Sequence, residues 1–455
     1  MAKEKEPQND EVVWPSVAIL IPNWNGRALL ETCLPPLAAQ SYPNYQIILI
    51  DNHSQDDSVA YTQANYPDVH IIQNEENLGF SRGVNVGLKS QTADVVVLLN
   101  NDVIVREGWL EALIRPTLDD PQIGIAGCKL LYPDGTIQHL GGRIEYPLAN
   151  GVHEHWHEPD SPEMAGLRDV EYVTGAAMAI TRPVLNTVGF FDEGFTPFYY
   201  EETDYCYRAR QAGFRIVVNA DAAAVHMESA SMEPVRHLQK YAYHKNRLRF
   251  VLKHFGAAQF LTDFAPAETN RLQAAFSAGE LQSLGRVYWE TAVTLPDLIS
   301  ENENPRPFAA VQDALLQLHQ AAQMQVVRKL AHTGGPQAEL DRRKTLSEIE
   351  FVSDTAVIGP LVAEFRRQWH NVAARWAVGH VMRQQNAFNQ LAGNILSEAN
   401  SQTKSNAADI RLLFDELFRL RREFALSMQE TQAAITQLQR QLDRIEKLLT
   451  ASRSP

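Results

Sequence analysis

Residues 95–103 read VVVLLNNDV, an apolar run that leads directly into Asn100, Asn101 and Asp102. Five consecutive apolar residues predict a strand that is covered on both faces, as in a parallel sheet beneath helices. Two amides and a carboxylate at the end of a buried strand are costly unless polar or cationic partners lie beside them. The stretch therefore predicts both a buried sheet and a polar site at its edge.

The same alternation extends outward from this stretch. Three more apolar runs of strand length precede it: VAILIP (17–22), QIILID (46–51) and VHIIQN (69–74). Helix-like stretches separate the runs: RALLETCLPPLAAQ (27–40), SVAYTQANY (58–66) and SRGVNVGLKSQ (81–91). Strands that alternate with helices predict an α/β fold with a mostly parallel sheet. Ligands of such sheets bind at the carboxyl ends of the strands, where Asn23, Asn25 and Asp51 also stand.

The bulk composition excludes several classes of protein. The 455 residues carry a net charge of −14, which disfavours non-specific nucleic-acid binding. Cys33, Cys128 and Cys206 are far apart, so we expect neither a disulfide framework nor a zinc knuckle. The charged N-terminal stretch lacks a signal core, and no run reaches the roughly 18 apolar residues of a membrane span. These features predict a cytoplasmic protein.

The pattern changes near residue 235, where strand signals fade. Ala-, Leu-, Gln- and Glu-rich stretches follow, with breaks near 262–266, 300–307 and 333–336. From Ile410 to Leu449, apolar residues recur at alternating three- and four-residue steps, which predicts a coiled coil or a helix packed on its own domain. The expected parts are a polar tail (1–15), an α/β domain (16–255), a helical domain (256–404) and a long helix (405–451). The apolar helix face predicts a homodimer.

Polar residues after the strands suggest nucleotide and cation binding. Asp51 can accept a hydrogen bond from a ribose hydroxyl or a base N–H, although it or Asp56 can equally cap the next helix. Gly83, Asn85 and Gly87 give the helix-like stretch 81–91 a small face that a ligand or backbone can approach. The LNND ending can bind a hard cation together with phosphate, or can form an ordinary hydrogen-bonded turn.

Two later segments carry titratable groups. FYYEETDYCYRARQAGFRI (198–216) brings Glu201, Glu202 and Asp204 within four residues. Like charges that are partly buried raise at least one carboxyl pKa, which suits a general base. The alternative is a charged helix N-terminus, with Arg208 and Arg210 as salt-bridge partners. His226, in AVHMESAS (224–231), is either a metal or phosphate ligand or a structural histidine.

Taken together and in this order, these segments resemble the family 2 glycosyltransferases of the GT-A fold, especially bacterial rhamnosyltransferase-type enzymes. The resemblance covers about residues 17–255. It is carried by the segments IPNWNG, IILIDNHSQDDS, ENLGFSRGVNVGL, VVLLNNDV, VTGAAMAITRPVLNTVGFFDEGF, YYEETDYCYRARQAGFRI and VHMESAS.

The resemblance implies a role for each matching residue. Asp102 would hold Mg²⁺ or Mn²⁺ at the donor diphosphate, and His226 would face the metal or the diphosphate. Asn100 stands where the family has the first acid of its Asp-x-Asp motif, which predicts a weaker, more phosphate-dependent metal site. Glu202 stands at the position of the base, where aspartate is usual, so Glu201 and Asp204 remain candidates. The residues expected to bind the nucleotide-sugar donor are Pro22, Asn23, Asn25, Asp51, Asn77, Gly79, Phe80, Asn85, Asn100 and Asn101.

The implied reaction is a single displacement with inversion. A carboxylate would take the proton of an acceptor hydroxyl, which attacks the anomeric carbon of a nucleotide-diphosphate sugar. The acceptor would be a glycan or a lipid-linked saccharide in cell-surface polysaccharide synthesis, and a lipid-linked acceptor would require peripheral docking at the membrane. The turn-rich segment 133–170 would shape the acceptor pocket, and its His153, His155 and His157 are either a metal cluster or solvent-exposed.

Two other functions compete with this hypothesis. A degenerate transferase domain could serve as a scaffold that works through its C-terminal helices, as the amide at Asn100 and the glutamate at Glu202 would allow. A nucleotidyltransferase would need a Gly-rich phosphate loop with Arg or Lys after the first strand, and IPNWNGRAL lacks one.

Overall fold

The structure, a computed structural model, describes residues 14–227, 239–274, 276–298 and 305–332. Residues 1–325 form one compact unit and residues 326–455 form another. The expected coiled coil at 405–451 lies outside the described residues, as do most of the expected tail (1–15) and residues 333–404. The homodimer and the boundary expected near 255 therefore stay predictions.

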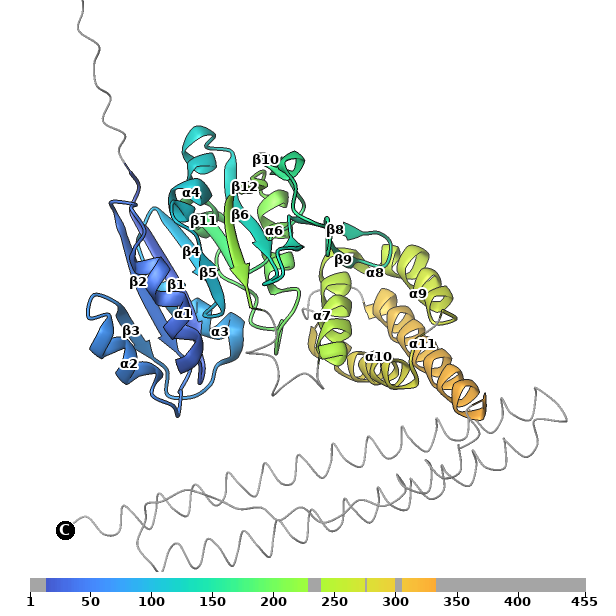
Figure 1. Ribbon diagram of the computed structural model, residues 1–455. Helices are drawn as coiled ribbons and strands as arrows, with labels where there is room; N and C mark the ends of the chain where they lie inside the picture. The colour runs from blue at the N-terminus through green and yellow to red at the C-terminus, as the bar shows by residue number, and fades with distance from the viewer. Residues whose placement is uncertain (1–13, 228–238, 275, 299–304, 333–455) are drawn as a thin grey trace, which may run out of the picture. The chain divides into compact units, whose positions relative to one another are not determined.

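An α/β arrangement occupies the first part of the chain (Figure 1). The strands are β1 (Val17–Asn23), β2 (Tyr45–Asp51), β3 (His70–Gln73), β4 (Val95–Leu99), β5 (Val103–Val105), β6 (Ile123–Leu131), β7 (Ile137–His139), β8 (Gly142–Glu145), β9 (Asn150–His153), β10 (Leu167–Asp169), β11 (Ala177–Thr181) and β12 (Arg215–His226). The accompanying helices are α1 (Arg27–Ala38), α2 (Ser58–Asn65), α3 (Gly79–Lys89), α4 (Trp109–Asp119), the short 3₁₀ helix η1 (Pro162–Met164), α5 (Arg182–Val188) and α6 (Glu201–Gln211).

Ten of the strands in the described residues form one sheet in the order β10-β12-β6-β11-β4-β1-β2-β3, with β5 paired to β12 and β7 to β6. β3, β2, β1 and β4 are parallel to one another, and β6 is parallel to β12. β11 lies antiparallel between β4 and β6, so β6 and β12 run in the direction of β4. The predicted α/β fold with a mostly parallel sheet is confirmed.

Helices on both faces explain why the strands are apolar throughout. Every residue of β4 and β6 is buried. Ile19 and Ile21 of β1 lie in a hydrophobic cluster that also contains Leu30 and Leu34 of α1. Leu20, which points to the opposite face, packs against α3. Burying a side chain of this size contributes roughly 1.5–3 kcal/mol, so both faces of the sheet stabilise the fold.

The segment 133–170 is more regular than its turn-rich sequence predicts. β7 extends the sheet beside β6, β8 and β9 form a separate antiparallel hairpin, and β10 pairs with β12. These strands have three or four residues each, too few for a periodic pattern to be visible. The segment therefore consists of two short strands that extend the main sheet and a separate hairpin, rather than an extended loop.

Helices follow the sheet, as predicted. They are α7 (Gln239–His254), α8 (Gly256–Gln259), the π-helix η3 (Phe260–Phe264), α9 (Ala265–Arg271), α10 (Ala278–Leu298) and α11 (Pro305–His332). The break predicted near 262–266 is wrong. Pro266 stands in the first turn of α9, directly after the π-helix η3, and the helical path continues from α8 through η3 into α9. None of the described helices is both long and apolar enough to cross a bilayer.

A buried ion pair joins three of these helices. Glu268 on α9 accepts hydrogen bonds from Arg247 on α7, from Arg271, and from Tyr288 on α10. Glu268 and Arg247 are fully buried. Burial raises the pKa of Glu268, but Arg247 and Arg271 outweigh burial and hold this pKa below its ordinary value of 4.5. The pair therefore stabilises the fold above pH 4.5, and the contribution is lost on acidification.

Replacing Glu268 with glutamine is expected to lower the free energy of unfolding by about 3–5 kcal/mol, because Arg247 would keep a buried charge without its counterion. Urea denaturation at neutral pH measures the loss. Arg286→Gln is the matched control, because Arg286 pairs with Glu290 at the surface and such pairs contribute little. Equal losses in the two variants would contradict the assignment.

Candidate active site

The expected donor-binding residues begin at the carboxyl ends of β1 and β2. The parallel register places Asn23 opposite Asp51. The Asn23 amide donates to Asp51 Oδ1 at 3.3 Å and to Ser54 Oγ at 3.2 Å, and its oxygen accepts from Asn101 Nδ2 at 2.8 Å. A Cβ atom at Gly26 would lie 2.3 Å from the side chains of both asparagines, so the close approach requires glycine. Buried amides thus tie the ends of β1, β2 and β4 together.

Asn25 and Asp51 organise the turn that follows β2. Asn25 has a left-handed backbone (φ 50°), and its side-chain oxygen accepts from the Gln55 N–H at 2.7 Å. Asp51 Oδ2 accepts from the Ser54 N–H at 3.1 Å, and only 2% of Asp51 is exposed. Pro22, also expected at the donor, is a half-buried residue of β1. The contacts of Asn25 and Asp51 therefore fix the turn at the strand-end edge.

The residues expected on and before α3 separate into two groups. Asn77 accepts from the Gly79 N–H at 2.9 Å, and Gly79 (φ 71°) begins the helix, so both lie with Phe80 at the edge. The Asn85 side-chain amide instead donates to the Phe191 carbonyl at 2.9 Å and to Glu193 Oε1 at 3.0 Å. Its amide holds the loop before α6.

The small face predicted on α3 packs against the sheet. A Cβ at Gly83 would meet the Asn52 side chain, and a Cβ at Gly87 would meet Ile50 and Leu20. The glycines therefore allow a close approach of helix and strand.

Asp102 and His226 meet at the same edge, although 124 residues separate them. β5 pairs with the end of β12, which places Val103 opposite His226, and the Met227 N–H donates to the Asp102 carbonyl at 2.9 Å. This pairing leaves His226 Nε2 3.1 Å from Asp102 Oδ1. The carboxylate is buried and the imidazole is nearly so. Asn100 lies half-buried beside them, with its N–H bound to the Ala176 carbonyl.

The pair fits a divalent cation that takes its other ligands from water and phosphate. Neighbouring ligands of an octahedral ion with bonds of about 2.1 Å lie about 3.0 Å apart, close to the observed separation. A carboxylate oxygen and an imidazole lone pair at 3.1 Å would repel each other unless a proton or a cation lay between them. Within the part of the chain that the structure describes, no three His, Cys, Asp or Glu side chains form a metal cluster. Asp102 and His226 would be two of the ligands of such a cation.

Gln138 orients His226, a role that the sequence analysis missed. Its side-chain oxygen lies 2.6 Å from His226 Nδ1, and only 4% of Gln138 is exposed. When Nδ1–H donates to this oxygen, Nε2 presents its lone pair toward Asp102. A glutamine in TIQH gives no local signal, because its role depends on β7 lying beside β6.

We expect Gln138→Leu to weaken Mn²⁺ binding about 10–100-fold, the usual cost of removing the partner of a metal-binding histidine. Leucine retains much of the buried volume, so the fold should persist. Titration of Mn²⁺ by electron paramagnetic resonance, with a nucleoside diphosphate present, measures the change. An unchanged Mn²⁺ affinity would show that His226 does not need this partner.

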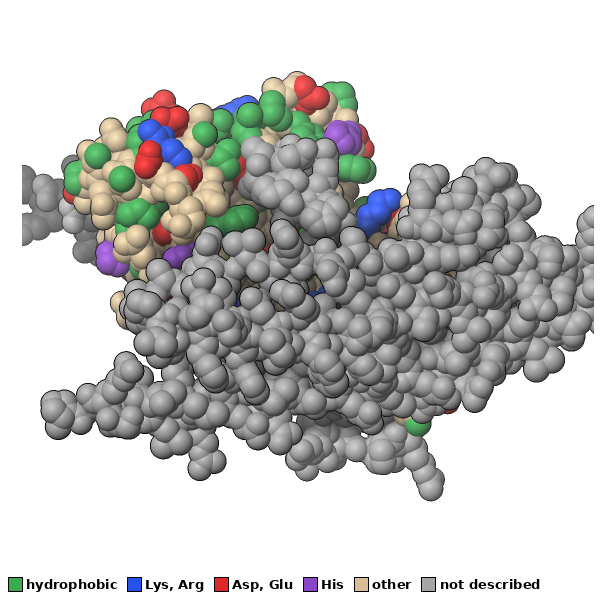
Figure 2. Space-filling model, turned by 90° about the horizontal axis from the view of Figure 1, so that it is seen from below, with side chains coloured by type: hydrophobic (Ala, Val, Ile, Leu, Met, Phe, Trp, Pro, Cys, Tyr) green, Lys and Arg blue, Asp and Glu red, His purple; other side chains and the backbone are tan. Residues whose placement is uncertain are grey.

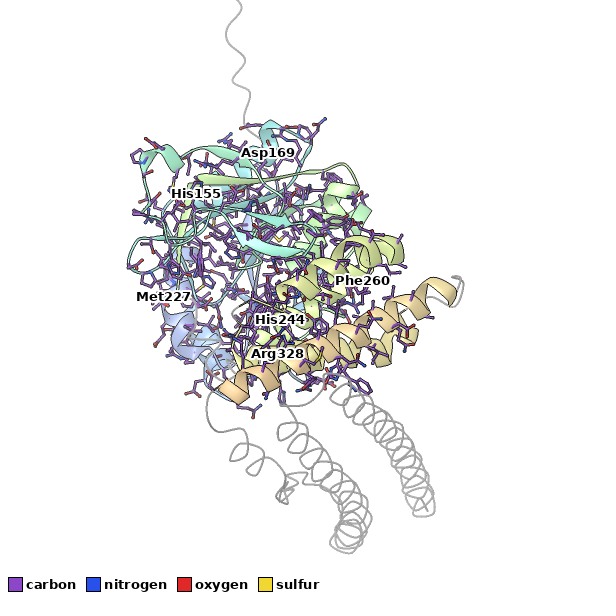
Figure 3. The ribbon with its side chains drawn as sticks, turned by 90° about the vertical axis from the view of Figure 1, so that its right-hand side faces the viewer. His155, Asp169, Met227, His244, Phe260 and Arg328 are labelled. Atoms are coloured by element: carbon purple, nitrogen blue, oxygen red, sulfur yellow. The ribbon has the colours of Figure 1, made fainter. Side chains whose placement is uncertain are left out.

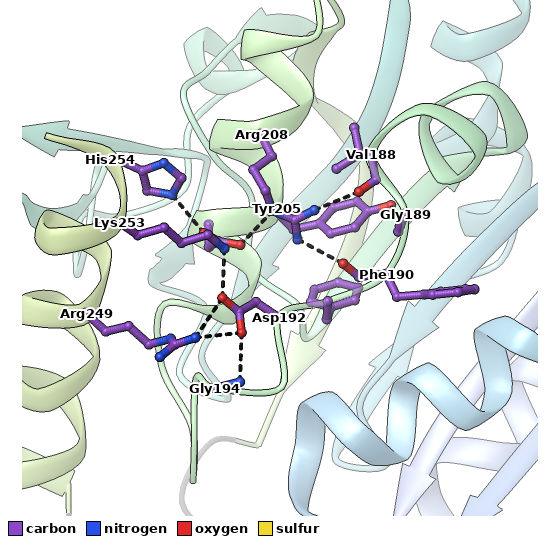
Figure 4. A network of polar contacts seen from close by, with 12 residues as sticks. Val188, Gly189, Phe190, Asp192, Gly194, Tyr205, Arg208, Arg249, Lys253 and His254 are labelled. Atoms are coloured by element: carbon purple, nitrogen blue, oxygen red, sulfur yellow. Dashed lines mark hydrogen bonds and ion pairs between the residues drawn. The ribbon is translucent and has the colours of Figure 1, made fainter. Parts of the chain in front are cut away.

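Asp204 belongs to an ion-pair network, and Figure 4 labels its partners Arg208, Lys253 and His254. It is fully buried and contacts Arg208 at 2.8 Å, Lys253 at 2.7 Å and His254 at 2.8 Å. Burial raises its pKa, but these partners lower the pKa below its ordinary value. Because Lys253 and His254 stand on α7, these contacts join α6 to α7, and Lys253 also pairs with Asp192 in the loop before α6. Asp204 is therefore placed for a structural task.

Glu201 and Glu202 have the environment of a proton acceptor. Burial, followed by the negative charge of Glu202, raises the pKa of Glu201 well above its ordinary value. Burial raises the pKa of Glu202 to about 7. Within the described residues, Glu201 Oε2 is buried without a hydrogen-bond partner. The Cβ of Glu202 lies 3.7 Å from a Cβ built at Gly175, and the Phe80 ring lies 3.3 Å from the same point.

Gly175 lies beside Glu202 and is followed by a residue that contacts the turn after β4, which contains Asp102. The next residue, Ala176, accepts the Asn100 N–H at 2.9 Å. Phe80, Glu202 and the turn after β4 are thus brought to one place on the sheet edge.

The described part of the face seen from below carries interspersed acidic, basic and apolar side chains (Figure 2).

The loop histidines do not converge on one point. His155 Nδ1 contacts Glu158 at 2.9 Å, His157 stacks on Tyr132, and His153 Nδ1 lies 3.3 Å from the Gln138 carbonyl. Their separate partners give no support to the hypothesis of a second metal.

Comparison with known proteins agrees with this geometry. The model of "Glycosyltransferase like family 2" matches residues 15–251, more than half of the chain. An O-antigen biosynthesis protein, RfbC of Myxococcus xanthus, is 29% identical over 227 residues, which cover 48% of this chain and 18% of RfbC. The N-acetylglucosaminyl-diphospho-decaprenol L-rhamnosyltransferase of Mycobacterium tuberculosis (strain ATCC 25618 / H37Rv) is 26% identical over 49% of this chain and 79% of its own length.

The chain therefore spans only a small fraction of RfbC. Among solved structures, a mannosyltransferase of Pyrobaculum calidifontis in complex with GDP-Man and Mn²⁺ is 16% identical, with a TM-score of 0.39 over 70% of this chain and 88% of that one. The strand-end edge and the family match together lead to one conclusion: this chain belongs to the family 2 glycosyltransferases.

Proposed function

We propose that the chain transfers a sugar from a nucleotide-diphosphate donor to a hydroxyl of a glycan or lipid-linked acceptor, with inversion and with Mg²⁺ or Mn²⁺. The observation that supports the proposal most strongly is that a pair of possible metal ligands and a possible general base lie at the same edge of the sheet. The Asp102–His226 pair suits a cation and a diphosphate, and Glu202, with a pKa raised to about 7, suits a base.

The residues divide the reaction between them. Glu202 accepts the proton of the acceptor hydroxyl as this oxygen attacks the anomeric carbon, and the bond to the diphosphate breaks. Asp102 and His226 would hold the metal, which neutralises charge on the leaving diphosphate. Asn77, Gly79 and Phe80 lie at the edge where the nucleotide would bind. Asn100 supplies an amide where a second carboxylate would strengthen the metal site.

Rhamnose is the first donor sugar to test, because one relative is an N-acetylglucosaminyl-diphospho-decaprenol L-rhamnosyltransferase. That name and the O-antigen relative support a role in cell-surface polysaccharide synthesis. A cytoplasmic location, peripheral membrane binding and a homodimer through the C-terminal helix accompany the proposal as expectations.

Thermal-shift measurements against nucleotide sugars, with Mn²⁺ or Mg²⁺, test the proposal. A bound donor should raise the unfolding temperature only when the metal is present, because ligand binding stabilises the folded state. The stabilising donor should then be hydrolysed or transferred in the same buffer. Donor binding without turnover would favour the scaffold hypothesis. Neither binding nor turnover with any donor would sink the proposal.

A further inference from the structure

An exposed group of aromatic rings stands outside the site described above. Trp156 is 58% exposed, and its indole N–H donates to the Tyr132 hydroxyl at 2.9 Å. The His157 ring stacks on Tyr132, with centroids 4.7 Å apart and planes 8° apart, and lies 4.5 Å from the Trp156 ring. We call Tyr132, Trp156 and His157 the aromatic platform.

The backbone is constrained to display the platform. His155 and His157, on either side of Trp156, have left-handed backbones, with φ of 56° and 63°. This conformation is unfavourable for residues other than glycine and persists only where the surroundings enforce it. Two backbone hydrogen bonds with Ile137 hold the loop. The His157 N–H donates to the Ile137 carbonyl, and the Ile137 N–H donates to the Glu158 carbonyl, both at 2.8 Å. Figure 3 labels His155 on the same side of the view as Met227.

Hydrogen bonds and an ion pair stiffen the loop further. His155 Nδ1 contacts Glu158 at 2.9 Å, and the Glu158 N–H donates to the His155 carbonyl at 3.0 Å. Lys129, which is buried, pairs with Asp160 at 2.8 Å. A rigid loop that exposes a tryptophan reduces the entropy cost of binding to that ring.

The platform is connected through β7 to the groups assigned to the diphosphate. His157 is bonded to Ile137, and the neighbouring residue, Gln138, orients His226. In the sheet order, β6 and β7 are separated from β1 and β2 by β11 and β4. The expected nucleotide residues stand on β1 and β2, so the platform lies on the opposite flank of Asp102. A ligand there would approach the reaction from the acceptor side.

The chemistry of the platform favours a sugar ring. An aromatic face offers an apolar surface for the C–H face of a pyranose, while the hydroxyls need polar neighbours. The Tyr132 hydroxyl and the His157 ring provide such neighbours beside the indole. We propose that Trp156 stacks on a pyranose ring of the acceptor glycan and thereby sets acceptor specificity. The assignment rests on the proposed function, and its binding step is measurable without a donor.

The test uses the full chain and two defined probes, octyl N-acetylglucosaminide and octyl rhamnoside. Saturation-transfer difference NMR should show contact between the protein and the pyranose C–H groups of at least one probe. Trp156→Ala should weaken this binding about tenfold or more, and Trp156→Phe should restore part of it, because phenylalanine keeps an aromatic face. Phe190→Ala, which removes another exposed aromatic ring, is the matched control and should bind as the wild type does.

Thermal shifts with nucleotide sugars and Mn²⁺ separate this proposal from the proposed function. Trp156→Ala should keep the wild-type shift, because the donor residues are elsewhere. Wild-type affinity for the probes in Trp156→Ala, or no binding of either probe to the wild type, would overturn the acceptor assignment. Loss of self-association in Trp156→Ala with unchanged probe binding would also overturn it, in favour of protein docking. If no nucleotide sugar raises the unfolding temperature of the wild-type protein, that result would instead count against the proposed function.

Discussion

Glu202→Gln is expected to slow glycosyl transfer about 10²–10⁴-fold, the usual contribution of a general base. Glutamine matches the size of glutamate but cannot accept the proton of the acceptor hydroxyl. Burial raises the pKa of Glu202 to about 7, so the wild-type carboxyl can exchange protons near neutral pH. Initial rates at saturating donor measure the loss, provided that donor binding is confirmed for the variant.

The pH dependence follows from the same raised pKa. The base works only when ionised, so the wild-type rate should fall about tenfold per pH unit below pH 7. The residual activity of Glu202→Gln should not show this fall in rate below pH 7.

Folding stability has the opposite dependence on pH. The unfolded carboxyl ionises near 4.5, while the folded one stays protonated up to about 7. The contribution of Glu202 to stability is therefore complete below pH 4.5 and falls as the pH rises toward 7. Glutamine stays neutral, so the variant should lose no stability at neutral pH.

Asp204→Asn distinguishes the base from its neighbour. Asp204 pairs with Arg208, Lys253 and His254, so its loss should lower the unfolding temperature and leave the shape of the pH profile unchanged. If Asp204→Asn removes the pH step near 7 and Glu202→Gln retains it, the assignment of the base is wrong. Glu201→Gln completes the comparison, because the pKa of Glu201 is raised as well.

Asp102→Asn is expected to lower turnover about 10³-fold, because charge on the departing diphosphate would lose its metal-based stabilisation. The Asp102 side chain is the carboxylate beside His226, and Asn100 cannot replace its charge. Wild-type protein treated with a chelator should show the same residual rate as the variant. Mn²⁺ binding followed by electron paramagnetic resonance provides a readout independent of turnover.

The matched control for this substitution is Asp94→Asn at the other end of β4. Asp94 accepts hydrogen bonds from the Ser16 N–H and hydroxyl, far from His226 along the strand. Its loss should affect stability and leave Mn²⁺ binding intact. Full activity of Asp102→Asn in the presence of chelator would contradict a metal at this site.

Sequence patterns predicted the α/β sheet because β1, β2 and β4 are buried on both faces and therefore read as continuous apolar runs. The polar strand ends were also visible, since Asp51 and Asp102 each follow such a run. The short strands between residues 133 and 170 were not predictable, because three or four residues carry no period.

Tertiary contacts give the candidate residues different environments. The sequence grouped Glu201, Glu202 and Asp204 by spacing alone, whereas helix α7 supplies the cations that distinguish Asp204 from the others. No local sequence pattern around Asn85 predicts that its amide would bind the loop at Phe191, which is 106 residues away. The contact of Gln138 with His226 depends on two strand pairings that no local pattern encodes.

The buried contact between Asn23 and Asn101, with Gly26 pressed against both, has an evolutionary consequence. A larger or charged residue at any of these three positions would displace the other two. Related sequences should therefore change them together or leave all three unchanged. Laboratory libraries that vary these positions one at a time would therefore miss the combined changes that keep the contact.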